Sequence, residues 1–189
     1  MGFFSWVRRV VDTGTTDVST GWSLGGVLGA YGGVPDRAAP PQSSAELPAP
    51  LSAVRLGRWF TTHGYTHFVD NDGDVGGVWR GRLFYFFLFG EQGEILQVRG
   101  QWNREFAIER LPEVLEICNE WNAEKIWPKA YVRVRDDGMV HVASEVATDL
   151  EHGATDAQLG QLLHCGLSTA SMFFDHLDDL YPDPAAAPP

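Results

Sequence analysis

The sequence predicts an α+β domain built on a single antiparallel five-stranded sheet, with helices packed on one face in the order α-β-β-β-α-β-β-α. The run Leu83–Phe89 is apolar throughout and is followed by a turn, which is typical of a strand. The triplet Asp136-Asp137-Gly138 separates two alternating segments and indicates a hairpin. Apolar residues at helical spacing occur before, between and after these strand segments.

The first helix is expected to begin near Leu51, with Ser52 as its N-cap and Gly64 ending it. Three strands should follow it, because alternating or continuous apolar residues are separated there by turn residues. These strands are expected at residues 65–69, 82–89 and 95–102.

The second half should contain a helix beginning at Pro112, a favoured first-turn residue. The hairpin then joins strands at 129–135 and 139–146. Thr155 and Gln158 have the spacing of a capping box, which predicts the start of a long helix that Pro182 ends.

The 189 residues divide by composition into three parts. Residues 1–50 are rich in Gly, Pro and Ser and are predicted to form a flexible tail, residues 51–181 the folded domain, and residues 182–189 a disordered C-terminus. Apolar residues interrupt the glycines of the tail, so it is either a linker with incidental apolar residues or a segment that docks on an apolar surface. These residues are Trp22, Leu24, Val27, Leu28 and Tyr31.

The formal net charge of −11 and the pI of about 4.8 argue against nucleic-acid binding, because phosphates require clustered Lys and Arg. No Lys or Arg follows Arg135, whereas many Asp and Glu do. This acidic half is either a solvated surface that keeps the protein in solution or a docking surface for a basic partner.

Cys118 and Cys165 both lie in helical patterns and are expected to be free, structural thiols, which agrees with a reducing compartment. No apolar run has the length of a membrane span, and the N-terminus does not match a signal peptide. These observations predict a cytoplasmic protein without a transmembrane segment.

The polar motifs do not predict a catalytic, metal or cofactor site. Asp70, Asp72 and Asp74 resemble the start of a calcium loop, but Val75 and Gly81 replace its essential glycine and glutamate, so a turn is expected. His63 and His67 are four residues apart with Gly64 between them. No nucleophile signature or phosphate-binding glycine motif occurs. We therefore expect a protein that is not an enzyme.

The aromatic run at 83–89 is the strongest functional clue, because a strand with one solvated face should alternate and this one does not. Phe84, Phe86 and Leu88 are expected to face the helices. The residues at the odd-numbered positions should face outward, where the hydroxyl of Tyr85 is more easily hydrated. Arg99, Tyr131 and Arg133 share the outward parity of their strands. The candidate protein-binding residues are therefore Leu83, Tyr85, Phe87, Phe89, Arg99, Tyr131 and Arg133.

Several segments together resemble the YbjN domain family of bacterial sensory transduction regulators, whose fold is similar to that of type III secretion chaperones. The resemblance covers about residues 51–181. It is carried by Leu115–Asn122, by Lys129 before the hairpin, and by Leu150–Thr155 with Leu159. Asn119 and Asn122 have the spacing of two helical asparagines typical of the family and are expected to bond helix-end carbonyls or the next strand. The resemblance implies a cytoplasmic, non-enzymatic protein that binds other proteins.

Two functional hypotheses follow. The leading one is a chaperone-like or regulatory adaptor whose outer sheet face binds a protein partner or a second copy, as a homodimer or a heterodimer with a related domain. The alternative is a sensory domain that binds a small apolar ligand between sheet and helices. Five tryptophans could line such a pocket: Trp59, Trp79, Trp102, Trp121 and Trp127.

Overall fold

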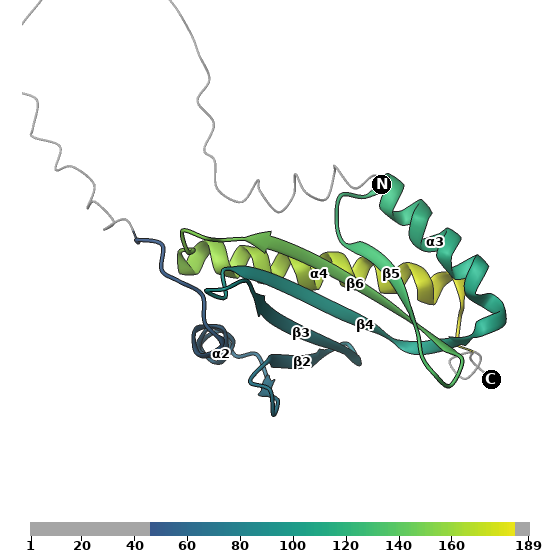
Figure 1. Ribbon diagram of the computed structural model, residues 1–189, viewed down its shortest axis with the longest axis horizontal. Helices are drawn as coiled ribbons and strands as arrows, with labels where there is room; N and C mark the ends of the chain where they lie inside the picture. Colours follow the sequence, from purple (N-terminus) through teal and green to yellow (C-terminus); the bar gives the residue numbers. More distant parts are fainter. Residues whose placement is uncertain (1–45, 184–189) are drawn as a thin grey trace, which may run out of the picture. The chain divides into compact units, whose positions relative to one another are not determined.

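The computed structural model describes residues 46–183 (Figure 1). They form one antiparallel sheet of six strands in the order β1-β2-β3-β4-β6-β5. The strands are β1 (Phe68–Val69), β2 (Val75–Trp79), β3 (Arg82–Phe89), β4 (Ile95–Ala107), β5 (Lys129–Val134) and β6 (Met139–Asp149). The helices are α2 (Ala53–Thr62), the 3-10 turn η1 (Ile108–Arg110), α3 (Leu111–Glu124) and α4 (Asp156–Leu180). The single antiparallel sheet is confirmed, but its strand number was predicted one too low.

Helix α2 begins and ends at the predicted residues. The Ser52 hydroxyl accepts a hydrogen bond from the Arg55 backbone N–H at 3.1 Å. Gly64, just beyond the helix, has φ of +74°, a conformation that glycine adopts without strain. Leu56 and Phe60 are fully buried, so this helix packs its apolar side on the sheet.

Strand β2 was not predicted, because Gly76 and Gly77 disfavour a strand by composition. Aromatic rings from neighbouring residues replace the missing side chains. A Cβ on Gly76 would lie 2.4 Å from the Phe68 ring, and one on Gly77 would lie 2.3 Å from the Trp79 ring. The two glycines therefore admit an aromatic ring on each face of the sheet, and β2 pairs along its whole length with β3.

Strand β4 continues five residues beyond the predicted end at Trp102. Its pairing with β6 is irregular between Gln101 and Glu105, after which regular pairing resumes. Trp102 and Phe106 are both buried on the same side of the sheet. The irregularity thus extends the sheet while keeping aromatic residues in the core.

The three helices bury their apolar residues against one face of the sheet, which we call the inner face. In Figure 1, α4 runs behind β4 and β6. A Cβ on Gly166 of α4 would lie 2.6 Å from Val98, which measures how closely this helix approaches β4. Helix α3 packs on α4 through Trp121 and Phe173, whose ring centroids are 5.0 Å apart. The predicted placement of helices on one face is confirmed.

The hairpin and the long helix follow the prediction. Gly138 occupies the hairpin turn with φ of +79°. Thr155 and Gln158 form the expected reciprocal capping box at the start of α4. None of the helices among residues 46–183 is both long enough and apolar enough to cross a membrane.

Candidate functional site

The outer face of the sheet contains all seven predicted binding residues. Strand register decides which of them are neighbours: Tyr85 lies opposite Arg99 of β4, and Arg99 lies opposite Glu145 of β6. Tyr131 of β5 lies opposite Ala143, and Arg133 opposite His141, with β6 and β4 between them and β3. The structure therefore places the four β3 residues beside Arg99, while Tyr131 and Arg133 lie at the far edge of the same face.

The face assignment of the aromatic strand is confirmed. Phe84 and Phe86 are buried, with 0% and 1% of their surface exposed. Leu83 and Phe89 are 37% and 44% exposed on the opposite face. Parity alone was sufficient here because β3 is regular along its length.

Six apolar side chains adjoin on the outer face, and we call them the aromatic patch. They are Phe68, Val78, Leu83, Tyr85, Phe87 and Phe89. Ring contacts link the aromatic members, with centroid separations of 5.7 Å for Phe68 and Tyr85, 5.3 Å for Tyr85 and Phe87, and 5.7 Å for Phe87 and Phe89. None of the six carries a charge.

Phe68 and Val78 belong to this patch but were not predicted. Phe68 lies opposite Gly76, and Val78 lies opposite Leu83, so both occupy the outer face. Phe68 is 38% and Val78 62% exposed. The available signal was the glycine pair, since a strand glycine often marks the approach of an aromatic ring from a neighbouring strand.

Beyond the aromatic patch, the outer face carries Ile95, Ala143 and Ala147 and a network of hydrogen-bonded polar side chains. The Arg99 guanidinium lies 4.7 Å from the centroid of Phe87 and donates to Gln97 at 2.6 Å. The Gln97 amide donates to Glu145 at 3.2 Å, and Lys129 pairs with Glu145 at 3.3 Å. This network borders the aromatic patch along β4 and neutralises much of its own charge.

Tyr131 is more enclosed than a surface tyrosine. Burial is the main reason that the pKa of its hydroxyl is raised, and Arg99 acts in the opposite direction. The Lys129 ammonium lies 5.8 Å from the ring centroid. Tyr131 therefore takes part in the polar half of the outer face, and Arg133 beside it is exposed.

The inner face contains an ionic cluster around the buried Arg82 that the sequence analysis did not foresee, and the carboxylates of Asp175 and Asp178 in it are 42% exposed. Arg82, only 4% exposed, pairs with Asp175 at 2.8 Å and also with Asp178. Asp178 accepts further hydrogen bonds from Trp102 at 2.9 Å and from Arg104 at 2.7 Å. Burial would raise the pKa of Asp178, but these donors outweigh it and lower that pKa. The cluster anchors α4 to β3 and β4.

The five tryptophans proposed for a ligand pocket do not meet in one cavity. Trp102 and Trp59 are buried, with 2% and 5% of their surface exposed. Trp121 packs on Phe173, and Trp127 is 41% exposed. Only Trp79 lines the groove of about 350 Å³ that the structure describes on the α4 side of the domain. Its lining is Tyr65, Trp79, Arg80, His164, Leu167, Ser168, Ser171, Met172 and Asp175.

The histidines near this groove take part in packing. His63 stacks on Trp59 with centroids 4.0 Å apart, and His67 lies beside Phe60 at 5.8 Å. The Tyr65 hydroxyl and His164 Nε2 are 3.1 Å apart. Burial, followed by repulsion from His63, lowers the pKa of His164. Within residues 46–183, no group of three His, Cys, Asp or Glu side chains is arranged to hold a metal ion.

Both cysteines are free thiols, as expected. Cys118 is buried in α3, which raises its pKa to about 11, and burial also raises the pKa of Cys165. At neutral pH both are protonated. They are therefore weak nucleophiles.

Asn122 takes the role expected of the paired helical asparagines. Its amide donates to the Ala130 carbonyl at 2.9 Å and its Oδ1 accepts from the Ala130 N–H at 2.8 Å. Ala130 lies in β5, the last strand of the sheet, so Asn122 occupies backbone groups that an edge strand would otherwise expose. Asn119 is exposed on α3.

A family model matches residues 52–179, and its description is YbjN, "Putative bacterial sensory transduction regulator". The chain belongs to the YbjN family. A solved structure with the same fold is that of "YbjN, a putative transcription regulator from E. coli", with a TM-score of 0.60 and 15% identity over 70% of this chain and 95% of that one. A search of curated proteins gives no match. For this YbjN domain, the similarity to type III secretion chaperones stays a prediction.

Proposed function

We propose that this YbjN domain is a non-enzymatic protein-binding module that uses the aromatic patch to hold a polypeptide or a second copy of itself. The observation that carries the proposal is that six adjoining apolar side chains lie on the sheet face opposite the three described helices. Contiguous exposed apolar surface rimmed by polar groups is typical of interaction sites. Aromatic side chains are also enriched where interfaces gain most of their binding energy.

The surroundings of the patch favour a polypeptide ligand. The polar rim through Arg99, Gln97 and Glu145 offers hydrogen-bonding groups beside the apolar surface. An apolar centre with a polar rim is the usual arrangement of a protein interface. The family description of a regulator agrees with a role exerted through binding, and a chaperone-like or adaptor role in the cytoplasm is part of our proposal.

The test replaces two central patch residues in the full chain, Tyr85→Ser with Phe87→Glu. We expect the double variant to fold and to lose self-association or partner capture by at least tenfold. The matched control is Leu115→Ser with Ile126→Glu, two exposed apolar residues on α3 and the following loop, 40% and 83% exposed. The control should behave like the wild type.

The readouts are light scattering of the purified protein and affinity capture from the native cell followed by mass spectrometry. The proposal is supported if the patch variant loses association or partner capture while the control variant keeps both. If the patch variant associates and captures partners like the wild type, the aromatic patch is not the binding surface and the proposal is wrong.

The alternative, a sensory domain for a small apolar ligand, has less support. The core between sheet and helices is filled by fully buried side chains, including Phe60, Phe86 and Phe174. The groove beside Trp79 is polar on one side, with Ser168, Ser171 and Asp175. Binding of an apolar fluorescent probe that survives in the patch variant and is lost in Trp79→Ala would favour this alternative.

A further inference from the structure

Arg99 carries the only charge among the outward-facing side chains of the paired segments 83–89 and 95–101. The outward positions in β3 are Leu83, Tyr85, Phe87 and Phe89, and those in β4 are Ile95, Gln97, Arg99 and Gln101. Arg99 lies directly opposite Tyr85, and its guanidinium carbon lies 4.7 Å from the centroid of Phe87. A polypeptide that covers Tyr85 and Phe87 therefore also covers this cation.

Arg99 has no carboxylate within ion-pair distance among residues 46–183, although the net charge of the protein is −11. Glu145 lies opposite it in register, but Lys129 binds one oxygen of that carboxylate and Gln97 the other. The Arg99 guanidinium donates to Gln97, and its buried Nε has no hydrogen-bond partner in the same part of the chain. Six other arginines there do pair with a carboxylate: Arg55, Arg80, Arg82, Arg104, Arg110 and Arg135.

Covering Arg99 has an energetic consequence for any ligand of the aromatic patch. Removing a guanidinium from water is unfavourable unless an anion replaces the lost hydration. A carboxylate does so with charge-assisted hydrogen bonds, and arginine is enriched beside aromatic residues at the centres of interfaces. The Phe87 ring and Gln97 already hold the guanidinium, so pairing would restrict it little further. A fitting ligand thus carries a carboxylate beside its apolar side chains.

A second copy of the chain does not meet this requirement. The same two strand segments of that copy would present another Arg99 and no carboxylate. Its Glu145 lies on the next strand and is already bound by Lys129 and Gln97. Packing two such faces together would bring two like charges into one interface, which is unfavourable. These charges favour a different polypeptide.

We propose that the aromatic patch binds an apolar segment of another protein that carries an Asp or Glu side chain, and that this carboxylate pairs with Arg99. The inference rests on the proposed function, because it takes the aromatic patch as the polypeptide-binding surface. It goes beyond that function in selecting another protein over a second copy and in naming the charged group that this protein carries.

The experiment selects peptides from a random phage-displayed library on the immobilised full chain. The selected peptides should combine apolar residues with Asp or Glu, the acidic residues being enriched about threefold over the library. Non-specific attraction to a protein with a net charge of −11 would enrich Lys and Arg instead. Selection of basic peptides, or of apolar peptides without acidic enrichment, would overturn this inference.

Synthetic forms of one selected peptide then measure the pairing with Arg99. Replacing its acidic residue by the corresponding amide should weaken binding to the wild type about tenfold. The acid and amide forms should bind Arg99→Gln equally, and the amide form should bind this variant as well as it binds the wild type. The matched control is Arg58→Gln on α2, an exposed residue on the helix side, which removes the same charge and should keep the full preference. A preference for the acid form that survives in Arg99→Gln would contradict the pairing.

A neutral variant of the aromatic patch separates this inference from the proposed function. Tyr85→Ser with Phe87→Ser places no carboxylate beside Arg99 and should lose binding of the acid and amide forms alike. If the selected peptides show no acidic preference but require Tyr85 and Phe87, this inference fails and the proposed function stands. If no selected peptide depends on these two residues, both fail.

Discussion

The two faces of β3 carry the same kind of side chain in opposite surroundings. Phe86 packs on Phe60 of α2 with ring centroids 4.6 Å apart, and Phe84 packs on Phe174 of α4 with centroids 6.2 Å apart. Tyr85 and Phe87, one residue away on the outer face, contact each other and the patch residues Phe68 and Phe89, and Arg99 lies over the Phe87 ring. The inner set is fully buried and stabilises the fold most, whereas the half-buried outer set gains less from burial. The difference shows that packing against the helices accounts for the inner aromatic residues but not for those of the outer face.

The largest expected effect is on the inner face. Phe84→Ser with Phe86→Glu should unfold the domain, because each large core truncation costs about 3–5 kcal/mol and a buried carboxylate adds more. Tyr85→Ser with Phe87→Glu should cost roughly 1–2 kcal/mol, since both side chains are only half buried. Urea unfolding followed by circular dichroism measures both. Equal losses from the two pairs would show that the faces do not differ in this way.

The second largest effect on stability is expected at the ionic cluster that pairs Arg82 with Asp178 on the inner face. Asp178→Asn should lower the free energy of unfolding by about 2–3 kcal/mol, because Arg82 stays buried with one partner fewer. Asp179→Asn, at the exposed neighbouring residue, should stay within about 0.5 kcal/mol of wild type. Chemical denaturation at neutral pH compares them, and similar losses for both variants would refute a specific role of Asp178.

The Asp178 carboxylate should also make the free energy of unfolding depend on pH in the acid range. Its folded pKa lies below the ordinary value of 3.8, so the unfolded state takes up the proton first as the pH falls. The contribution is present above pH 4 and is lost below it. Asp178→Asn should therefore flatten the acid limb of the stability curve.

A smaller effect is expected at the sheet edge. Asn122→Ala should cost about 2 kcal/mol, since it leaves the N–H and carbonyl of Ala130 without the amide that binds them. Asn119→Ala on the same helix is the control and should be nearly neutral. Thermal unfolding distinguishes them. If both variants unfold at the same temperature as the wild type, water replaces the Asn122 amide with no loss of stability.

The smallest expected effect is a loss of stability at alkaline pH that comes from the Cys118 thiol. Because burial raises the pKa of Cys118 from 9.0 to about 11, the unfolded thiol ionises first as the pH rises. The stabilisation by the neutral thiol is complete below pH 9 and is lost as the pH rises toward 11, by about 1 kcal/mol at pH 10. The wild type should lose this amount relative to Cys118→Ala between pH 8 and 10, measured by urea unfolding. Parallel curves would show that the thiol ionises equally in both states.

The elements with a strong local signal were predictable from the sequence. Capping residues Ser52 and Thr155 and the turn glycine Gly138 fixed the ends of α2, α4 and the hairpin by local hydrogen bonds and backbone conformation. Strand β2 was missed because Gly76 and Gly77 have no local preference for a strand. The rings of Phe68 and Trp79 fill the space beside them, and a propensity for single residues does not register this packing.

The candidate site was predictable as a face but not in its extent. Successive side chains of a strand point to opposite faces, which separates Tyr85 from Phe86 in β3 without any knowledge of the partner strands. Arg133 shares the outward parity, yet strand order places it at the far edge, and strand order is not encoded in local periodicity. The pairing of the buried Arg82 with Asp175 could not be predicted from local patterns either, since these residues are 93 positions apart.

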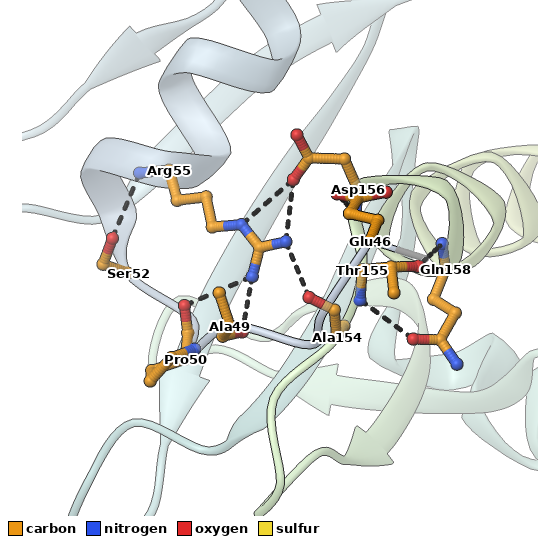
Figure 2. A network of polar contacts seen from close by, with 9 residues as sticks. All are labelled: Glu46, Ala49, Pro50, Ser52, Arg55, Ala154, Thr155, Asp156 and Gln158. Atoms are coloured by element: carbon orange, nitrogen blue, oxygen red, sulfur yellow. Dashed lines mark hydrogen bonds and ion pairs between the residues drawn. The ribbon is translucent and has the colours of Figure 1, made fainter. Parts of the chain in front are cut away.

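The hydrogen bonds of Arg55 to Ala49, Pro50 and Ala154 (Figure 2) also determine how the domain responds to mechanical load. A force applied to the chain before Glu46 meets the pairing of Ala49 with Ala154 before it reaches any strand of the sheet. The two backbone hydrogen bonds there and the bonds from Arg55 to Ala49 and Pro50 share that force. Traction on the preceding chain is thus borne first by these hydrogen bonds at the start of α4, before it acts on the core residue Leu51.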